Sequence, residues 1–180
     1  AAYTISEEAN CYRISTDDMQ VTVDKANGLV SFFNADGSLA CAETASLSNV
    51  PGEVSCAFCS MNDLAYYGGG YNGSHNQKGR KLVMNNTPHY EYDTKDFESL
   101  YVCVPFIVST SGYGIYFDDH FRGAEILPDD NGISYASKSP TPISYYFIGG
   151  GDTDKVMCNY TQLTGRQKLP PYWALGYITS

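Results

Sequence analysis

Short apolar runs alternate with polar residues and turn signals along the first part of the chain. Residues 19–24 alternate apolar and polar side chains with a period of two, which predicts a half-buried strand. The Asn-Gly dipeptide at residues 27–28 is typical of a tight hairpin, and residues 29–33 are the predicted return strand. A second turn at residues 34–37 leads to a predicted strand at residues 39–42. Since these strands follow one another through short turns, we expect an antiparallel meander without crossover helices.

The same alternation of short apolar segments and turns continues through most of the chain. Turn signals fall at residues 111–112, 129–132 and 149–151. The composition agrees with this pattern, because 16 Tyr and 8 Phe residues suit pleated, half-buried surfaces. Many short strands at this spacing predict an all-β fold, an antiparallel β-sandwich. The further predicted strands are residues 81–84, 100–109, 114–117 and 143–148.

One helix is predicted near the C-terminal end of the chain, over residues 153–164. Either Asp152 or Thr153 can cap its first turn, because a side-chain oxygen there accepts a hydrogen bond from an unpaired backbone N–H. Gly165 then ends the helix, and the Pro-Pro pair at residues 170–171 prevents its continuation. The predicted apolar stripe of this helix comprises Val156, Met157, Tyr160 and Leu163.

An apolar run at residues 172–178 follows the two prolines. Its composition indicates a buried strand, which would expose a hydrophobic edge if nothing paired with it. We therefore interpret it as the first strand of a structure that continues.

Length and charge exclude several classes of protein. A chain of 180 residues has the length of one domain, or of a large domain with a short appendage, and it is too short for a whole (β/α)₈ barrel, which needs roughly 250 residues. The net charge of −9 disfavours nucleic acid as a partner. No segment reaches the ~18 consecutive apolar residues of a membrane span, and the first residues lack the pattern of a signal peptide. Asn-x-Ser/Thr sequences at Asn72, Asn85 and Asn159 leave the compartment open, with an extracytoplasmic one favoured.

Neither the cysteines nor the histidines have the spacing of a metal site. Cys56 and Cys59 form a C-x-x-C pair, but a zinc site would need a second such pair. We interpret the cysteines as small apolar residues on strands and leave one disulfide open. We expect no metal and no cofactor, because no two histidines have the i, i+4 spacing of a metal-binding helix. The residues concerned are Cys11, Cys41, Cys56, Cys59, Cys103 and Cys158, with His75, His89 and His120.

The acidic residues do not form a catalytic pair by their spacing. Asp118 and Asp119 are adjacent on a predicted strand, so their side chains point to opposite faces and do not converge on one bond. We interpret them as capping the turn that follows. Residues 129–132 are likewise a turn and lack the D-x-D-x-D spacing of a calcium loop. The glycines at residues 68–70 permit close backbone approach, but they do not form a phosphate-binding loop.

A resemblance to a known family rests on residues 160–177. Their sequence, YTQLTGRQKLPPYWALGY, closely resembles the junction in glycoside hydrolase family 31 at which a helix leads into the first strand of the catalytic barrel. Upstream segments agree in order, although Tyr71 stands where the family pattern has Glu. The resemblance covers about residues 19–180. The upstream segments are residues 64–70, 84–92, 104–109 and 112–119.

This resemblance implies a galactose-mutarotase-like sandwich over residues 1–168, with residues 169–180 as the start of a (β/α)₈ barrel. Enzymes of the family cleave or transfer α-linked glucosyl or xylosyl units with retention, using two aspartates of the barrel. Those aspartates would lie beyond Ser180, so the resemblance implies no catalytic residue in this chain. It implies a non-catalytic domain that packs on its own barrel and serves an α-linked oligosaccharide as substrate.

The resemblance also implies a substrate-binding loop, which in the family reaches over the barrel mouth. The Thr87-Pro88 pair replaces an Asp that many relatives carry there, and the Pro-His-Tyr sequence resembles members that transfer glucosyl units. Two other functions stay open, a stand-alone carbohydrate-binding module and a mutarotase-like enzyme, and the parent could be a glucosyltransferase or an α-xylosidase. The predicted sugar-binding residues are Asn86, Thr87, His89 and Tyr90.

Overall fold

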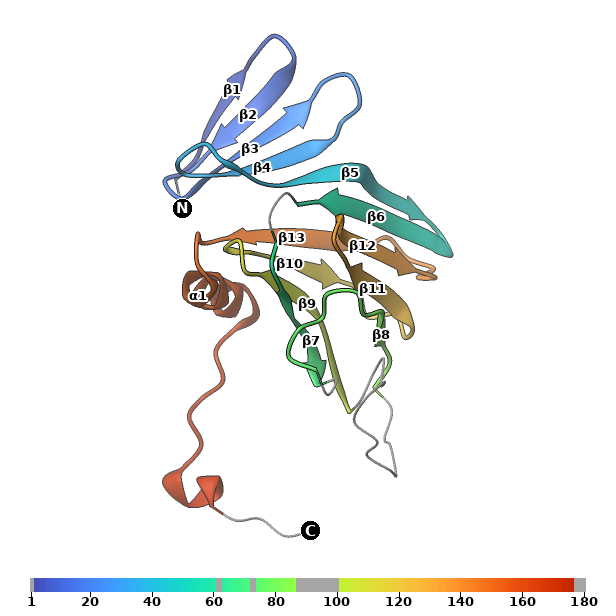
Figure 1. Cartoon of the computed structure of the whole chain (residues 1–180), viewed down its shortest axis with the longest axis vertical. Coiled ribbons are helices and arrows are strands. Elements are labelled where there is room, and N and C mark those ends of the chain that lie inside the picture. Colours follow the sequence, from blue (N-terminus) through green and yellow to red (C-terminus); the bar gives the residue numbers. More distant parts are fainter. Residues whose placement is uncertain (1, 61–62, 72–73, 87–100, 177–180) are drawn as a thin grey trace.

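The computed structural model describes residues 2–60, 63–71, 74–86 and 101–176, which form two β-sheets and one α-helix (Figure 1). Every strand pair in both sheets is antiparallel, and side chains from both sheets form a shared core, so the fold is the expected all-β sandwich. The elements are β1 (Thr4–Glu7), β2 (Cys11–Ser15), β3 (Met19–Asp24), β4 (Val30–Asn34), β5 (Leu39–Val50), β6 (Glu53–Cys59), β7 (Tyr66–Tyr71), β8 (Leu82–Met84), β9 (Val102–Ser109), β10 (Tyr113–Asp118), β11 (Ala124–Pro128), β12 (Gly132–Ser137), β13 (Ser144–Gly149), α1 (Thr153–Thr164) and a 3₁₀ helix, η1 (Tyr172–Leu175).

The two sheets differ in size. The larger has the strand order β1-β2-β3-β4-β5-β6-β12-β11-β8, and its first six strands follow one another along the chain. This is the antiparallel meander that the alternating pattern predicts. The smaller sheet has the order β13-β10-β9-β7, so the chain changes sheets after β6, where it crosses to β7 (Figure 1).

The strands predicted between residues 19 and 148 are present, and further strands were missed. β3 has its predicted bounds, whereas β5 runs on to Val50 instead of ending at Ala42. Its pairing with β6 shifts register twice, between Glu43 and Ala45 and between Ala45 and Ser48. β7 was missed because three glycines fill its centre; Gly70 has a φ of +95°, and a Cβ there would lie 2.1 Å from the Val102 carbonyl oxygen.

Aromatic side chains join the two sheets. Phe32 of the larger sheet stacks on Phe147 of the smaller one, with ring centroids 3.9 Å apart. Phe117 of the smaller sheet stacks on Tyr135 of the larger one at 4.2 Å. Such pairs add to the burial of apolar area, which is the main favourable contribution to folding. The six cysteines are free. Cys41 and Cys56 are buried on strands, as predicted, whereas Cys158 is exposed on α1, where the prediction was wrong.

Helix α1 packs on the outer face of the smaller sheet. Asp152 is its N-cap and accepts a hydrogen bond from the Lys155 backbone N–H at 2.7 Å, which confirms one of the two predicted caps. Val156 is fully buried, and Tyr160 stacks on Phe106 of β9 at 3.9 Å. Within the described residues, no helix is long and apolar enough to span a bilayer.

The predicted stripe of α1 was partly wrong. Val156 and Tyr160 lie four residues apart and face the sheet, but Met157 and Leu163 are 45% and 48% exposed. Met157 points away because one residue rotates a helix by about 100°, so a helix that rests on one flat sheet buries only a narrow face.

The strand predicted at residues 172–178 was also wrong over its described part. Tyr172–Leu175 forms the 3₁₀ helix η1, in which Tyr172, Trp173 and Leu175 are exposed. A strand needs a hydrogen-bonded neighbour, and η1 belongs to neither sheet. The division of the chain at residue 168 stays a prediction.

A buried carboxylate lies where the chain crosses from one sheet to the other. Asp63 is 8% exposed and accepts hydrogen bonds from Tyr66 Oη at 2.7 Å, from Tyr113 Oη at 2.6 Å and from Ser109 Oγ. Burial alone would raise the pKa of Asp63, but the hydroxyl donors, Ser109 first among them, outweigh burial and lower it. The carboxylate thereby joins the crossing to β7, to the end of β9 and to the start of β10.

We predict that Asp63 makes the chain sensitive to acid. Its folded-state pKa lies below its unfolded value of about 4, so its contribution to stability is present above that value and is lost as the pH falls through the folded pKa. The free energy of unfolding in urea, measured from pH 7 downward, should therefore fall more steeply for the wild type than for Asp63→Asn.

The matched control is Asp17→Asn, which removes an exposed carboxylate. This variant should follow the wild-type pH profile. Parallel profiles for the wild type and Asp63→Asn would contradict the assignment.

Candidate functional site

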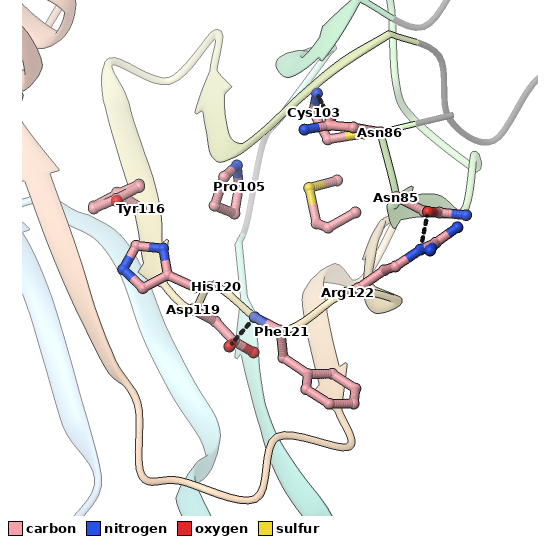
Figure 2. Close-up of a pocket in the computed structure, with 10 residues that line it drawn as sticks. Asn85, Asn86, Cys103, Pro105, Tyr116, Asp119, His120, Phe121 and Arg122 are labelled. Atoms are coloured by element: carbon pink, nitrogen blue, oxygen red, sulfur yellow. Dashed lines mark hydrogen bonds between the residues drawn. The ribbon is translucent and has the colours of Figure 1, made fainter. Parts of the chain in front are cut away.

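A pocket of about 380 Å³ opens where β8 of the larger sheet approaches β9 of the smaller one (Figure 2). Its walls come from three separate parts of the chain: the end of β8, the first half of β9, and the end of β10 with the connection to β11. Its volume is in the range of small-molecule sites. The lining residues are Met84, Asn85, Asn86, Cys103, Pro105, Tyr116, Asp119, His120, Phe121 and Arg122.

Asp119 fixes the connection from β10 to β11. One carboxylate oxygen accepts a hydrogen bond from the Phe121 backbone N–H at 2.8 Å, and the other accepts one from the hydroxyl of Tyr135. Burial, together with this bond to Asp119, raises the pKa of Tyr135. The predicted turn-capping role is therefore confirmed for Asp119. Asp118 instead lies 3.7 Å from the imidazole of the exposed His120.

Arg122 joins this connection to the end of β8. Its Nε donates to Asn85 Oδ1 at 2.6 Å, and the neighbouring Gly123 N–H donates to the Met84 carbonyl at 2.9 Å (Figure 2). These bonds hold the exposed guanidinium at the mouth of the pocket. The bond from a charged donor is the stronger of the two.

Asn86 is the predicted sugar-binding residue that the structure brings to this pocket. Its side-chain oxygen accepts a hydrogen bond from the Cys103 backbone N–H at 2.7 Å, which links the end of β8 to the start of β9. Thr87, His89 and Tyr90 lie outside the described residues, so their assignment stays a prediction.

Sequence reasoning missed Asn85, His120 and Arg122 as residues of this site. Arg122 is about 36 positions from Asn86 along the chain, and no local motif relates the two. A polar run directly after an apolar strand, here residues 118–122, is the signal that could have indicated a site at the strand's end.

The pocket has the composition of a binding site and not of a hydrolytic centre. Retaining glycoside hydrolysis needs two carboxyl groups about 5 Å apart. Among the lining residues Asp119 is the one acid, and both of its oxygens already accept hydrogen bonds. In the described part of the chain, no cluster of His, Cys, Asp and Glu could hold a metal ion.

Comparisons with known proteins agree on one family. The family model described as the glycosyl hydrolase 31 N-terminal galactose mutarotase-like domain matches residues 1–124. Alpha-glucosidase 2 of Bacillus thermoamyloliquefaciens is 33% identical over 72% of this chain and 17% of its own length. The isomaltosyltransferase of Sporosarcina globispora is 29% identical, with 97% of this chain and 17% of that protein covered.

The fold agrees with solved structures of the same family. A family 31 dextranase of Flavobacterium johnsoniae, solved in complex with glucose, is similar with a TM-score of 0.86 and 29% identity. The match covers 97% of this chain and 22% of the dextranase chain. The chain thus spans about a fifth of the length of the relatives it matches.

We predict that Asp119 contributes to stability as an anchor. Asp119→Ala leaves the buried Tyr135 hydroxyl without its acceptor and should cost about 2 kcal/mol in the free energy of unfolding. The neighbouring Asp118→Ala, which removes only an ion pair with an exposed histidine, should cost less than about 0.5 kcal/mol. Urea titrations of the two variants measure both values, and equal losses would refute the anchoring role.

Proposed function

The chain belongs to glycoside hydrolase family 31, as its N-terminal galactose mutarotase-like domain, and from this membership we propose that it is the non-catalytic domain of a larger enzyme that hydrolyses or transfers α-linked glucosyl units. The observation that carries the proposal is the match of nearly the whole chain to about a fifth of the length of family 31 enzymes. The pocket supports the non-catalytic part, because the one acid among its described lining residues serves as an anchor.

The proposed partner of this domain is the enzyme's own catalytic barrel. Helix α1 covers only part of the outer face of the smaller sheet, and beside it Tyr67, Tyr71 and Tyr146 are exposed on the same sheet. The segment after α1 carries Trp173, which is 82% exposed, with further exposed apolar side chains. An apolar surface of this kind is typical of a face that packs against another domain. The exposed side chains of the segment are Leu169, Tyr172, Trp173 and Leu175.

The proposed substrate is an α-linked gluco-oligosaccharide. The relative in complex with glucose is a dextranase, and another relative is an isomaltosyltransferase that matches 97% of this chain. In this proposal Asn86, Thr87, His89 and Tyr90 contribute to the substrate cleft, as the family resemblance of the loop implies. The isomaltosyltransferase match favours transfer as the alternative to hydrolysis.

The activity test uses the 180-residue chain by itself. With p-nitrophenyl α-glucoside and with isomaltotriose as substrates, we expect no turnover above the background, because the two catalytic aspartates belong to the barrel. Turnover that persists through successive purification steps and is abolished by an active-site inhibitor would contradict the proposal.

A second test addresses the proposed packing on the barrel. Trp173→Ser should change the unfolding free energy of the 180-residue chain by less than about 0.5 kcal/mol, since the side chain is exposed there. When the chain is joined to its catalytic barrel, the same change should cost about 2 kcal/mol, because the indole is then buried. Urea unfolding measures both. Met157→Ser, an exposed change on α1, is the matched control for the chain alone, and a Trp173 effect that is the same in both proteins argues against packing.

A further inference from the structure

The groups of the pocket fall into those already bonded and those available to a ligand. Both oxygens of Asp119 and the side-chain oxygen of Asn86 accept hydrogen bonds within the protein. Arg122 uses its Nε for Asn85, while within the described structure its Nη1 and Nη2 and the Nδ2 of Asn86 have no protein acceptor. The pocket therefore offers a ligand these N–H donors, beside the hydroxyl of Tyr116 and the imidazole of His120.

These donors are held in place before any ligand binds. Asp119 anchors the β10–β11 connection to Tyr135 in the core, and the Arg122–Asn85 bond fixes the guanidinium against the end of β8. Asn86 is fixed in the same way by the Cys103 backbone. A donor whose position is already set loses little conformational freedom on binding, which favours affinity.

Apolar side chains lie beside the donors. Met84, Pro105 and Phe121 line the same pocket as Arg122 and Asn86 (Figure 2). A pyranose ring presents C–H groups on its faces and hydroxyl oxygens around its edge, so it matches a pocket with an apolar wall and fixed donors. The parallel N–H groups of a guanidinium suit two neighbouring hydroxyl oxygens.

The charges near the pocket favour a neutral ligand. The guanidinium of Arg122 is positive, but Asp118 and Asp119 lie in the same connection, and the chain carries a net charge of −9. The nearby carboxylates would repel an anion such as a sugar phosphate, but they would not repel the uncharged hydroxyl groups of a sugar.

From these observations we infer that the pocket is a sugar-binding subsite of this domain, which takes one neutral glucosyl residue, with Arg122 as its main donor and Asn86 as the second. The inference deepens the proposed function and rests on it for the identity of the sugar. It adds Arg122, which comes from the β10–β11 connection, to the residues assigned to the substrate.

The test is a titration of the 180-residue chain with isomaltotriose, followed by ¹⁵N–¹H NMR. We expect a Kd on the order of 1 mM, with shifts at the Asn86 side-chain amide and the Gly123 backbone amide. Arg122→Ala should weaken binding about tenfold and Arg122→Lys about fivefold, since a lysine lacks the paired donors. Glucose 6-phosphate should bind more weakly than isomaltotriose.

The matched control is Arg13→Ala, which removes a guanidinium bonded to Glu8 and Gln20 on the N-terminal strands, outside the pocket. It should leave the Kd unchanged. Wild-type-like spectra of the Arg122 variants away from the pocket establish that they fold.

Three outcomes overturn the subsite: no shifts at the pocket, the same Kd for Arg122→Ala and the wild type, or tighter binding of glucose 6-phosphate. None of them bears on turnover by the complete enzyme, which tests the proposed function. If the complete enzyme does not act on α-glucosyl substrates while the titration gives the expected shifts, the proposed function fails and the subsite stands.

Discussion

The smaller sheet is organised around the burial of one ionised carboxylate. Asp63 lies on the crossing from β6 to β7, and an unpaired charge in such a place would cost several kcal/mol. Hydroxyls of Tyr66, Ser109 and Tyr113 satisfy it, and these residues come from β7, β9 and β10. The smaller sheet is thereby tied at the point where the chain enters it. β9 and β10 also carry two walls of the pocket, at the ends of these strands away from the carboxylate.

Asp119 is a second carboxylate that joins separate parts of the chain by accepting hydrogen bonds, and it lies at the pocket itself. It accepts hydrogen bonds from a core tyrosine and from its own turn, and so fixes the connection that carries Arg122. A binding surface can use its acid as an anchor and present fixed donors. A retaining glycosidase centre instead needs two carboxyl groups that face one bond. A domain with these properties suits a role beside the barrel, to which it would add affinity for the substrate while the barrel carries out the reaction.

The sequence alone predicted the parts of the fold that local patterns determine. The period of two in β3 and the cap of α1 at Asp152 each depend on a few neighbouring residues, and both were found. β7 was not predicted because glycines replace its alternating side chains. The exposed side of α1 was predicted wrongly because the width of a helix's buried face depends on the surface against which the helix packs. The pocket brings together residues 84–86, 103–105 and 116–122, and only their strand register places Arg122 near Asn86. The family resemblance indicated Asn86, whereas Arg122 required the structure.

The proposed subsite requires that this domain contacts the sugar itself, through donors fixed at the junction of its two sheets. A crystal structure of the 180-residue chain with isomaltotriose tests this contact. We expect electron density for one glucosyl ring in the pocket, with hydroxyl oxygens within hydrogen-bond distance of Arg122 Nη1 or Nη2 and of Asn86 Nδ2. Density for the sugar only at another surface, or an oligosaccharide bound with Arg122 turned away from it, would contradict the proposed subsite.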